Sequence, residues 1–103
     1  GTSYKFMEVR ILEDIREFIE RLKQDDSAKI LAHLKSIEEN LTEGLIIKTL
    51  KGRIKEIIVR QYRVIFFNIG ATAYVVDAFK KQSQKTPKRI IENAEKIYKG
   101  LKT

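Results

Sequence analysis

The first half of the chain carries apolar residues at helical spacing. From about Leu12 to Lys23 the apolar positions are three or four residues apart and polar side chains lie between them, which is typical of a helix with one buried side. After a break at residues 24–26, a second run of this kind continues to Leu41. Asp26 or Ser27 can cap this second helix, because a side-chain oxygen there accepts from free backbone N–H groups. The pattern predicts two amphipathic helices joined by a short link.

The second half is rich in Ile, Val, Phe and Tyr, which favour strands. Segments of this type cover residues 45–50, 54–59, 62–69 and 73–79. Turn candidates at Lys51-Gly52 and around Gly70 separate them, since Gly tolerates positive φ. A weak alternation over residues 4–12 could add a short strand at the start of the chain. Thr86-Pro87 then opens a last helix, with Thr at the cap and Pro at the first helical position.

These elements predict one domain over residues 1–103, because a chain of this length has room for a single core. The predicted class is α+β, with two N-terminal helices, a small antiparallel sheet of three to four strands and a C-terminal helix. We expect the helices to pack on one face of the sheet.

The composition excludes several classes of protein. With no cysteine, a disulfide scaffold, a cysteine nucleophile and a thiolate metal site are excluded. The single histidine, His33, allows no multi-histidine metal cluster and is expected to be structural or exposed. We therefore expect no metal and no cofactor. No apolar run approaches the roughly 18 residues of a membrane span, so we expect a soluble, cytoplasmic protein without a membrane partner.

The net charge of +7 is unevenly distributed. Residues 1–50 carry 8 Lys and Arg against 10 Asp and Glu, whereas residues 51–103 carry 13 against 4. Such a basic half favours a polyanion such as nucleic acid, an acidic protein or an anionic membrane surface as partner. The alternative is a basic surface without a specific ligand.

Basic residues of the second half form the first candidate site. Strand alternation is expected to place Arg53 and Lys55 on one face of the sheet. Arg63 lies inside an apolar run, so its guanidinium must reach solvent, bind an anion or pair with Glu56 or Asp77. The whole set is Lys51, Arg53, Lys55, Arg60, Arg63, Lys80, Lys81, Lys85, Lys88 and Arg89.

The start of the last helix is the second candidate. Residues 85–89 hold three cations, although cations are mildly unfavourable at a helix N-terminus. Exposed backbone N–H groups together with Lys and Arg make a phosphate site, and the alternative is a solvated basic helix end. Four tyrosines, at positions 4, 62, 74 and 98, could stack on bases, although core packing is the commoner role.

Several of these motifs occur together in one known family. The segment Tyr62-Arg63-Val64-Ile65-Phe66-Phe67, the Gly70 turn, Ala78-Phe79-Lys80-Lys81 and Lys85-Thr86-Pro87 resembles the phage-derived branch of RelE/HigB-like toxins. The likeness covers residues 45–99. It implies a RelE-like fold of the microbial-ribonuclease type and the toxin role in a type II toxin–antitoxin system. It also implies cleavage of mRNA, usually on the ribosome, and a cognate antitoxin, often a helix-turn-helix protein, in a homo-oligomer or a toxin–antitoxin heteromer.

The mechanism that fits this resemblance is metal-free transesterification, in which the 2′-OH attacks the adjacent phosphate. By the same resemblance, Arg63 is the phosphate-stabilising arginine, Lys80 and Lys81 are the basic pair after the last strand, and Lys55 and Arg60 supply further basic groups. The predicted RNA-binding residues are Arg53, Tyr62, Lys85, Lys88 and Arg89.

The chain also departs from the family pattern. The family's Glu-Leu-Arg on the preceding strand reads Glu56-Ile57-Ile58 here, so its arginine is missing. No His or Tyr directly follows the last strand to act as general acid, and Tyr98 is a distant substitute. These departures favour the alternative of a non-catalytic RNA- or protein-binding domain on the same fold, a degenerate toxin.

Overall fold

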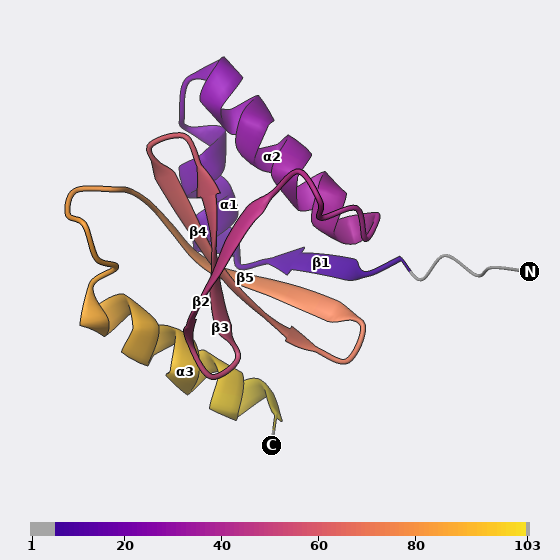
Figure 1. The fold of residues 1–103 in the computed structure, drawn as a ribbon, viewed down its shortest axis with the longest axis vertical. Helices are drawn as coiled ribbons and strands as arrows, with labels where there is room; N and C mark the ends of the chain where they lie inside the picture. Colours follow the sequence, from indigo (N-terminus) through magenta and orange to yellow (C-terminus); the bar gives the residue numbers. More distant parts are fainter. Residues whose placement is uncertain (1–5, 103) are drawn as a thin grey trace, which may run out of the picture.

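The computed structural model describes residues 6–102. Within these residues the chain forms three helices and five strands (Figure 1). Their order is β1 (Glu8–Ile11), α1 (Glu13–Glu20), α2 (Gln24–Glu38), β2 (Ile46–Lys51), β3 (Ile54–Val59), β4 (Tyr62–Ile69), β5 (Thr72–Lys80) and α3 (Lys88–Lys102). The α+β class is as predicted, but the predicted sheet is wrong.

The sheet has five strands in the order β1-β5-β4-β3-β2 and is mixed rather than antiparallel. Strands β2 to β5 form consecutive antiparallel pairs. β1 lies at the edge and pairs with β5 in parallel, from Glu8 opposite Thr72 to Ile11 opposite Val75. The weak alternation over residues 4–12 thus corresponds to a real strand, of which residues 4 and 5 lie outside the described part of the chain.

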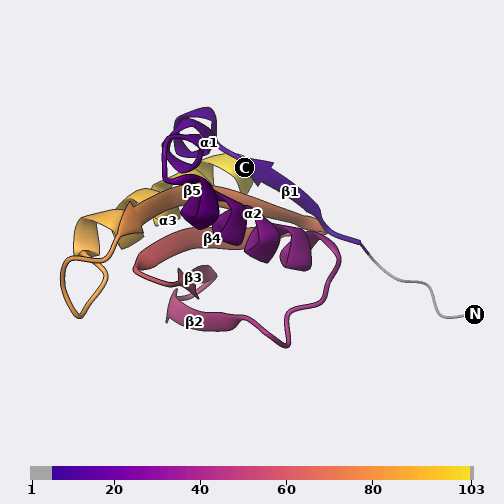
Figure 2. The ribbon, with the colours of Figure 1, turned by 90° about the horizontal axis from the view of Figure 1, so that it is seen from above.

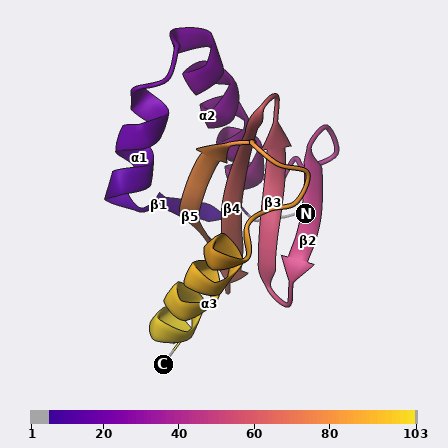
Figure 3. The same ribbon diagram turned by 90° about the vertical axis from the view of Figure 1, so that its left-hand side faces the viewer.

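Helices cover both faces of the sheet, so the expectation of a single covered face is wrong. α1 and α2 bury Ile19, Ile30 and Leu34 against one face, and α3 buries Ile90 and Ala94 against the other. Figures 1 and 3 show α3 on the opposite side of the sheet from α1 and α2.

The central strand β4 explains this arrangement. Val64 and Phe66 face α1 and α2, while Ile65 and Phe67 face α3, and all four are almost fully buried. A strand that is apolar on both faces is stable only when both faces are covered.

The helix starts also differ from the prediction. α2 begins at Gln24, so Asp26 and Ser27 lie in its first turn rather than at its cap. α3 begins at Lys88, one residue after Pro87. Figure 2 shows the connection from β5 to α3, residues 81–87, extending past the end of the sheet. Two of the cations of the second half, Lys81 and Lys85, lie in this connection.

Candidate active site

A small cationic cleft lies on the α3 side of the sheet, beneath the connection between β5 and α3. Its volume is about 40 Å³. Its lining comes from β2, β3, β4, β5 and the connection: Lys48, Glu56, Arg63, Phe79, Lys81, Ser83, Gln84, Lys85 and Thr86. We call this feature the cationic cleft. Four of these residues are cations and one is an acid, so the cleft is suited to an anion.

Arg63 lines the cationic cleft from β4, the middle strand of the sheet. The strand register sets it between Ile58 of β3 and Phe79 of β5. Its Nη1 donates to the backbone carbonyls of Arg60 at 3.0 Å and Tyr62 at 2.9 Å. Within residues 6–102 it forms no ion pair, so the pairing with Glu56 or Asp77 that the sequence left open is not made. A guanidinium has five N–H donors, and those of Nε and Nη2 remain for an anion.

Glu56 is the acid of the cleft and is 4% exposed. It lies opposite Lys48 in the register of β2 and β3. Its Oε1 accepts a hydrogen bond from the Thr86 hydroxyl, so Thr86 ties the connection to the sheet instead of capping α3. The Ser83 hydroxyl donates to the carbonyl of Lys85 at 2.8 Å and keeps the connection compact.

Lys81 is held beside the cleft by its own backbone. Its N–H donates to the carbonyl of Gln61, in the turn between β3 and β4, at 2.7 Å. That turn also supplies the Arg60 carbonyl that binds Arg63. The same turn therefore fixes two of the cations predicted for the site.

Three of the ten predicted site residues thus come together in the cationic cleft: Arg63, Lys81 and Lys85. Lys80 lies opposite Tyr62 and lines a different cleft. Lys55 lies opposite Phe66, on the face that α1 and α2 cover.

Arg60 does not line the cationic cleft and forms ion pairs with two aspartates of α2 instead. Its Nη1 contacts Asp25 Oδ2 at 3.4 Å and Asp26 Oδ1 at 3.1 Å. Arg53 lies in the turn between β2 and β3 rather than in a strand, so strand alternation does not apply to it. Lys88 and Arg89 are exposed at the start of α3.

The tyrosines pack in the core. Tyr62 is 7% exposed and forms a T-shaped pair with the Phe18 ring, with centroids 6.5 Å apart. Tyr74 and Tyr98 both lie against Phe67, at 5.7 and 5.2 Å. Tyr62 therefore has no open ring face for a base, and Tyr4 lies outside the described residues.

Two functional candidates were not predicted from the sequence as site residues, Lys48 and Glu56. Lys48 lies on the edge strand β2 and reaches the cleft only through its register with β3. Glu56 follows from strand alternation, because it shares a face with Ile54, which packs toward α3. Strand alternation could also have predicted that the side chains of Tyr62 and Arg63 lie on opposite faces of the sheet.

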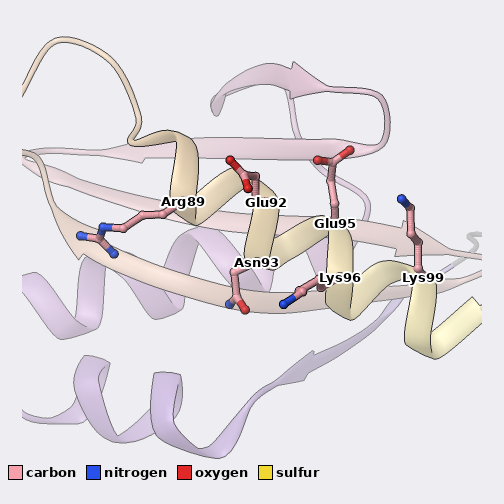
Figure 4. A pocket seen from close by; sticks show the side chains of 6 residues that line it. All are labelled: Arg89, Glu92, Asn93, Glu95, Lys96 and Lys99. Carbon is pink, nitrogen blue, oxygen red and sulfur yellow. The ribbon is translucent and has the colours of Figure 1, made fainter.

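A second cleft lies on the other side of Phe79. It measures about 370 Å³ and is lined by Phe18, Phe79, Lys80, Gln82, Pro87, Arg89 and Ile90. We call it the aromatic cleft. A further hollow of about 400 Å³ lies on the outer surface of α3 (Figure 4). One helix supplies its whole lining, which contains two acids and three cations, so it is a weaker candidate for an anion.

Asp77 lies on β5, opposite Ile65 of β4. It is partly buried, and its Oδ1 accepts the backbone N–H of Ala78 at 2.8 Å. Burial raises the pKa of Asp77, the Ala78 hydrogen bond lowers it, and the charge of Asp14 raises it further. The positive charge of Arg89 lowers this pKa.

Two further findings bear on the kind of site. Among residues 6–102, no three His, Asp or Glu side chains are grouped so that they could hold a metal ion. In the same part of the chain, no helix has the length and apolar character needed to cross a membrane.

Comparison with known proteins shows a family and a fold. Residues 17–99 match the family model described as Phage derived protein Gp49-like (DUF891). No curated protein matches the chain.

Two solved structures share the fold. One is the archaeal RelE-RelB complex from Pyrococcus horikoshii OT3, with a TM-score of 0.67 and 15% identity over 78% of this chain and 99% of that chain. The other is the RelB-RelE antitoxin-toxin complex from Methanococcus jannaschii, with a TM-score of 0.60 and 15% identity over 82% of this chain and 95% of that chain. The predicted resemblance to phage-derived RelE/HigB-like toxins is confirmed, and the chain belongs to the Gp49-like family of phage-derived proteins.

Proposed function

We propose that this protein is the toxin of a type II toxin–antitoxin system and cleaves mRNA by metal-free transesterification in the cationic cleft. One observation carries the proposal. Arg63 lies in the middle of the sheet with no carboxylate partner among the described residues, and Lys48, Lys81 and Lys85 line the same cleft. Membership of the Gp49-like family and the fold shared with RelE in its complexes with RelB support the toxin role.

The size and charge of the cationic cleft suit a phosphoryl group. Its volume of about 40 Å³ is a few times the roughly 10–15 Å³ that one water needs, which leaves no room for a nucleobase. Arg63 and the lysines would donate charge-assisted hydrogen bonds to the non-bridging phosphate oxygens. Because negative charge grows on these oxygens as the 2′-oxygen attacks, such donors stabilise the transition state more than the bound substrate.

The reaction needs a proton acceptor and a proton donor. The 2′-OH loses its proton as it attacks phosphorus, and the departing 5′-oxygen gains one, which leaves a 2′,3′-cyclic phosphate and a 5′-OH end. Glu56 is our candidate for the acceptor, because it is the one carboxylate that lines the cleft. Lys81 is our candidate for the donor, because its exposed ammonium lines the same cleft.

The proposed partners are mRNA, presented by the ribosome, and a cognate antitoxin, for which we expect a helix-turn-helix protein. The two solved structures that share the fold are each complexes of RelE with RelB. An antitoxin that covers the cationic cleft would block access of RNA to Arg63.

The test is expression in a bacterial host, followed by RNA cleavage in the presence of ribosomes. We expect the wild type to arrest growth and to leave 5′-OH and 2′,3′-cyclic phosphate ends. Arg63→Ala is expected to lower the cleavage rate about 10²- to 10³-fold, the usual cost of removing one donor to a developing oxyanion. Arg53→Ala is the matched control, since Arg53 is exposed in the turn between β2 and β3, and it should leave the rate unchanged.

A second candidate function is a non-catalytic RNA-binding domain on the same fold. Ile58 stands where the resemblance expects an arginine, and this observation favours it. This alternative predicts RNA binding that weakens with salt, no growth arrest and no new RNA ends. Those three results together would replace the nuclease proposal.

A further inference from the structure

The aromatic cleft differs from the cationic cleft in size and in chemistry. Its volume of about 370 Å³ falls at the lower end of the roughly 300–1,000 Å³ typical of small-ligand pockets. Two phenyl rings, a proline ring and an isoleucine supply apolar surface, whereas Lys80 and Arg89 supply positive charge. No acidic residue lines it. The combination fits a flat, apolar group that is attached to an anion.

We propose that the aromatic cleft takes one unpaired nucleobase of the RNA strand whose phosphate lies in the cationic cleft. This inference rests on the proposed function and adds a base subsite to it. The two clefts share one wall, the side chain of Phe79. A nucleotide next to the scissile phosphate could therefore place its base on one side of Phe79 while the phosphate lies on the other.

Phe18 and Phe79 are partly exposed, whereas Tyr62, Phe66 and Phe67 are buried. They come from different elements, α1 and the end of β5, and both line the aromatic cleft. Stacking of a base on an aromatic side chain contributes about 1–3 kcal/mol and tolerates every base. The sheet therefore offers a subsite that increases affinity without strict sequence preference.

The polar groups of the aromatic cleft fit the rest of a nucleotide. Arg89 can stack its guanidinium plane on a base or bind a phosphate, and Lys80 can bind a phosphate as a point charge. Gln82 offers both a donor and an acceptor to the edge of a base. An apolar peptide side chain would use the rings but would bring no negative charge to Lys80 and Arg89.

Abasic probes test the inference directly. The probe is a short, fluorescein-labelled RNA with 2′-O-methyl groups throughout, which blocks cleavage, together with a series in which one residue at a time lacks its base. We expect one position of the series to bind the wild type about 5- to 150-fold more weakly than the intact probe, the range that 1–3 kcal/mol of stacking gives. Fluorescence anisotropy measures the affinities.

Phe79→Leu and Phe18→Leu keep an apolar side chain but remove the flat ring. Both variants should bind the intact probe and that abasic probe with nearly equal affinity. Phe6→Leu is the matched control, because Phe6 lines a hollow formed with Met7, Asn40, Gly70 and Ala71, and it should discriminate like the wild type. Arg63→Ala should weaken both probes by the same factor.

The outcomes separate the two proposals. If the wild type binds RNA but no abasic position weakens binding, or if Phe79→Leu weakens both probes equally, the base subsite is wrong while the nuclease proposal stands. If the leucine variants lose affinity for the antitoxin and keep discrimination between the probes, the cleft is a protein-docking site and the inference is overturned. If the wild type neither binds nor cleaves RNA, both proposals fall.

Discussion

The turn at Arg60 gives the most quantitative prediction. Arg60 has a φ of 56°, in the left-handed region that costs a residue with a Cβ about 1–2 kcal/mol. Its side chain offsets this cost through ion pairs with Asp25 and Asp26 on α2. Asp26 is nearly buried, with 11% of its side chain exposed, so its pair with Arg60 is screened less than a surface pair. Strain and ion pairing therefore oppose each other at one residue.

Two substitutions separate these effects. Arg60→Ala loses the ion pairs and keeps the strain, so we expect it to lower the free energy of unfolding by about 1–2 kcal/mol, the range for a hydrogen bond to a charged group with allowance for the exposure of Arg60. Arg60→Gly loses the same ion pairs but removes the strain. We therefore expect the Gly variant to be about 1–2 kcal/mol more stable than the Ala variant.

Thermal unfolding followed by circular dichroism measures the difference. For a domain of this size, 1 kcal/mol corresponds to roughly 4–8 °C in Tm. The matched pair is Arg53→Ala and Arg53→Gly, because Arg53 is exposed and has no positive φ. There the order should reverse, since Gly loses more backbone entropy than Ala. An Ala variant at position 60 that equals or exceeds the Gly variant in stability would refute the account of this turn.

Three further changes test the surroundings of the cleft. Asp77→Asn should raise Tm at pH 7. Because the pKa of Asp77 is raised in the folded protein, ionisation of this carboxyl lowers the stability of the wild type as the pH rises above 3.8, the ordinary pKa of Asp. In a series of melts at different pH, the difference in Tm between Asp77→Asn and the wild type should therefore vanish below pH 3.8. Thr86→Val breaks the hydrogen bond to Glu56 and should lower RNA cleavage several-fold with a Tm change of a few degrees; an unchanged rate would show that the connection needs no tie to the sheet. Arg63→Lys should retain more RNA affinity than Arg63→Ala and flatten the salt dependence less, as measured by anisotropy at two salt concentrations.

Periodicity predicted the long elements well, and it failed where a strand is defined by a distant partner. The apolar run of residues 62–69 is β4, as predicted. β1 has four residues and pairs with residues more than 60 positions along the chain, so no local pattern could establish it. The apolar run in β4 indicated burial, yet only the packing of Phe67 against α3 shows that both faces are covered.

Only those residues of the candidate site whose local sequence context indicates a function could be predicted. Arg63 was identified because a charge inside an apolar run needs a partner. Lys48 was missed because its place depends on the register between β2 and β3, which the sequence does not encode locally. The expectation for Arg60 assumed a side chain directed toward RNA, whereas the buried Asp26 of α2 provides a nearer partner.

The position of α3 explains why this fold has room for a cleft at all. α3 packs on Ile54, Phe67 and Val76, which occupy one part of the sheet face. The row that contains Arg63 and Phe79 lies beyond the start of α3 and is covered by the connection over residues 81–87. Because this connection is polar and largely exposed, its cations can change without cost to the core. The fold can thus be shared with RelE at 15% identity while two of the lysines that line the cleft, Lys81 and Lys85, come from a segment that the core does not constrain.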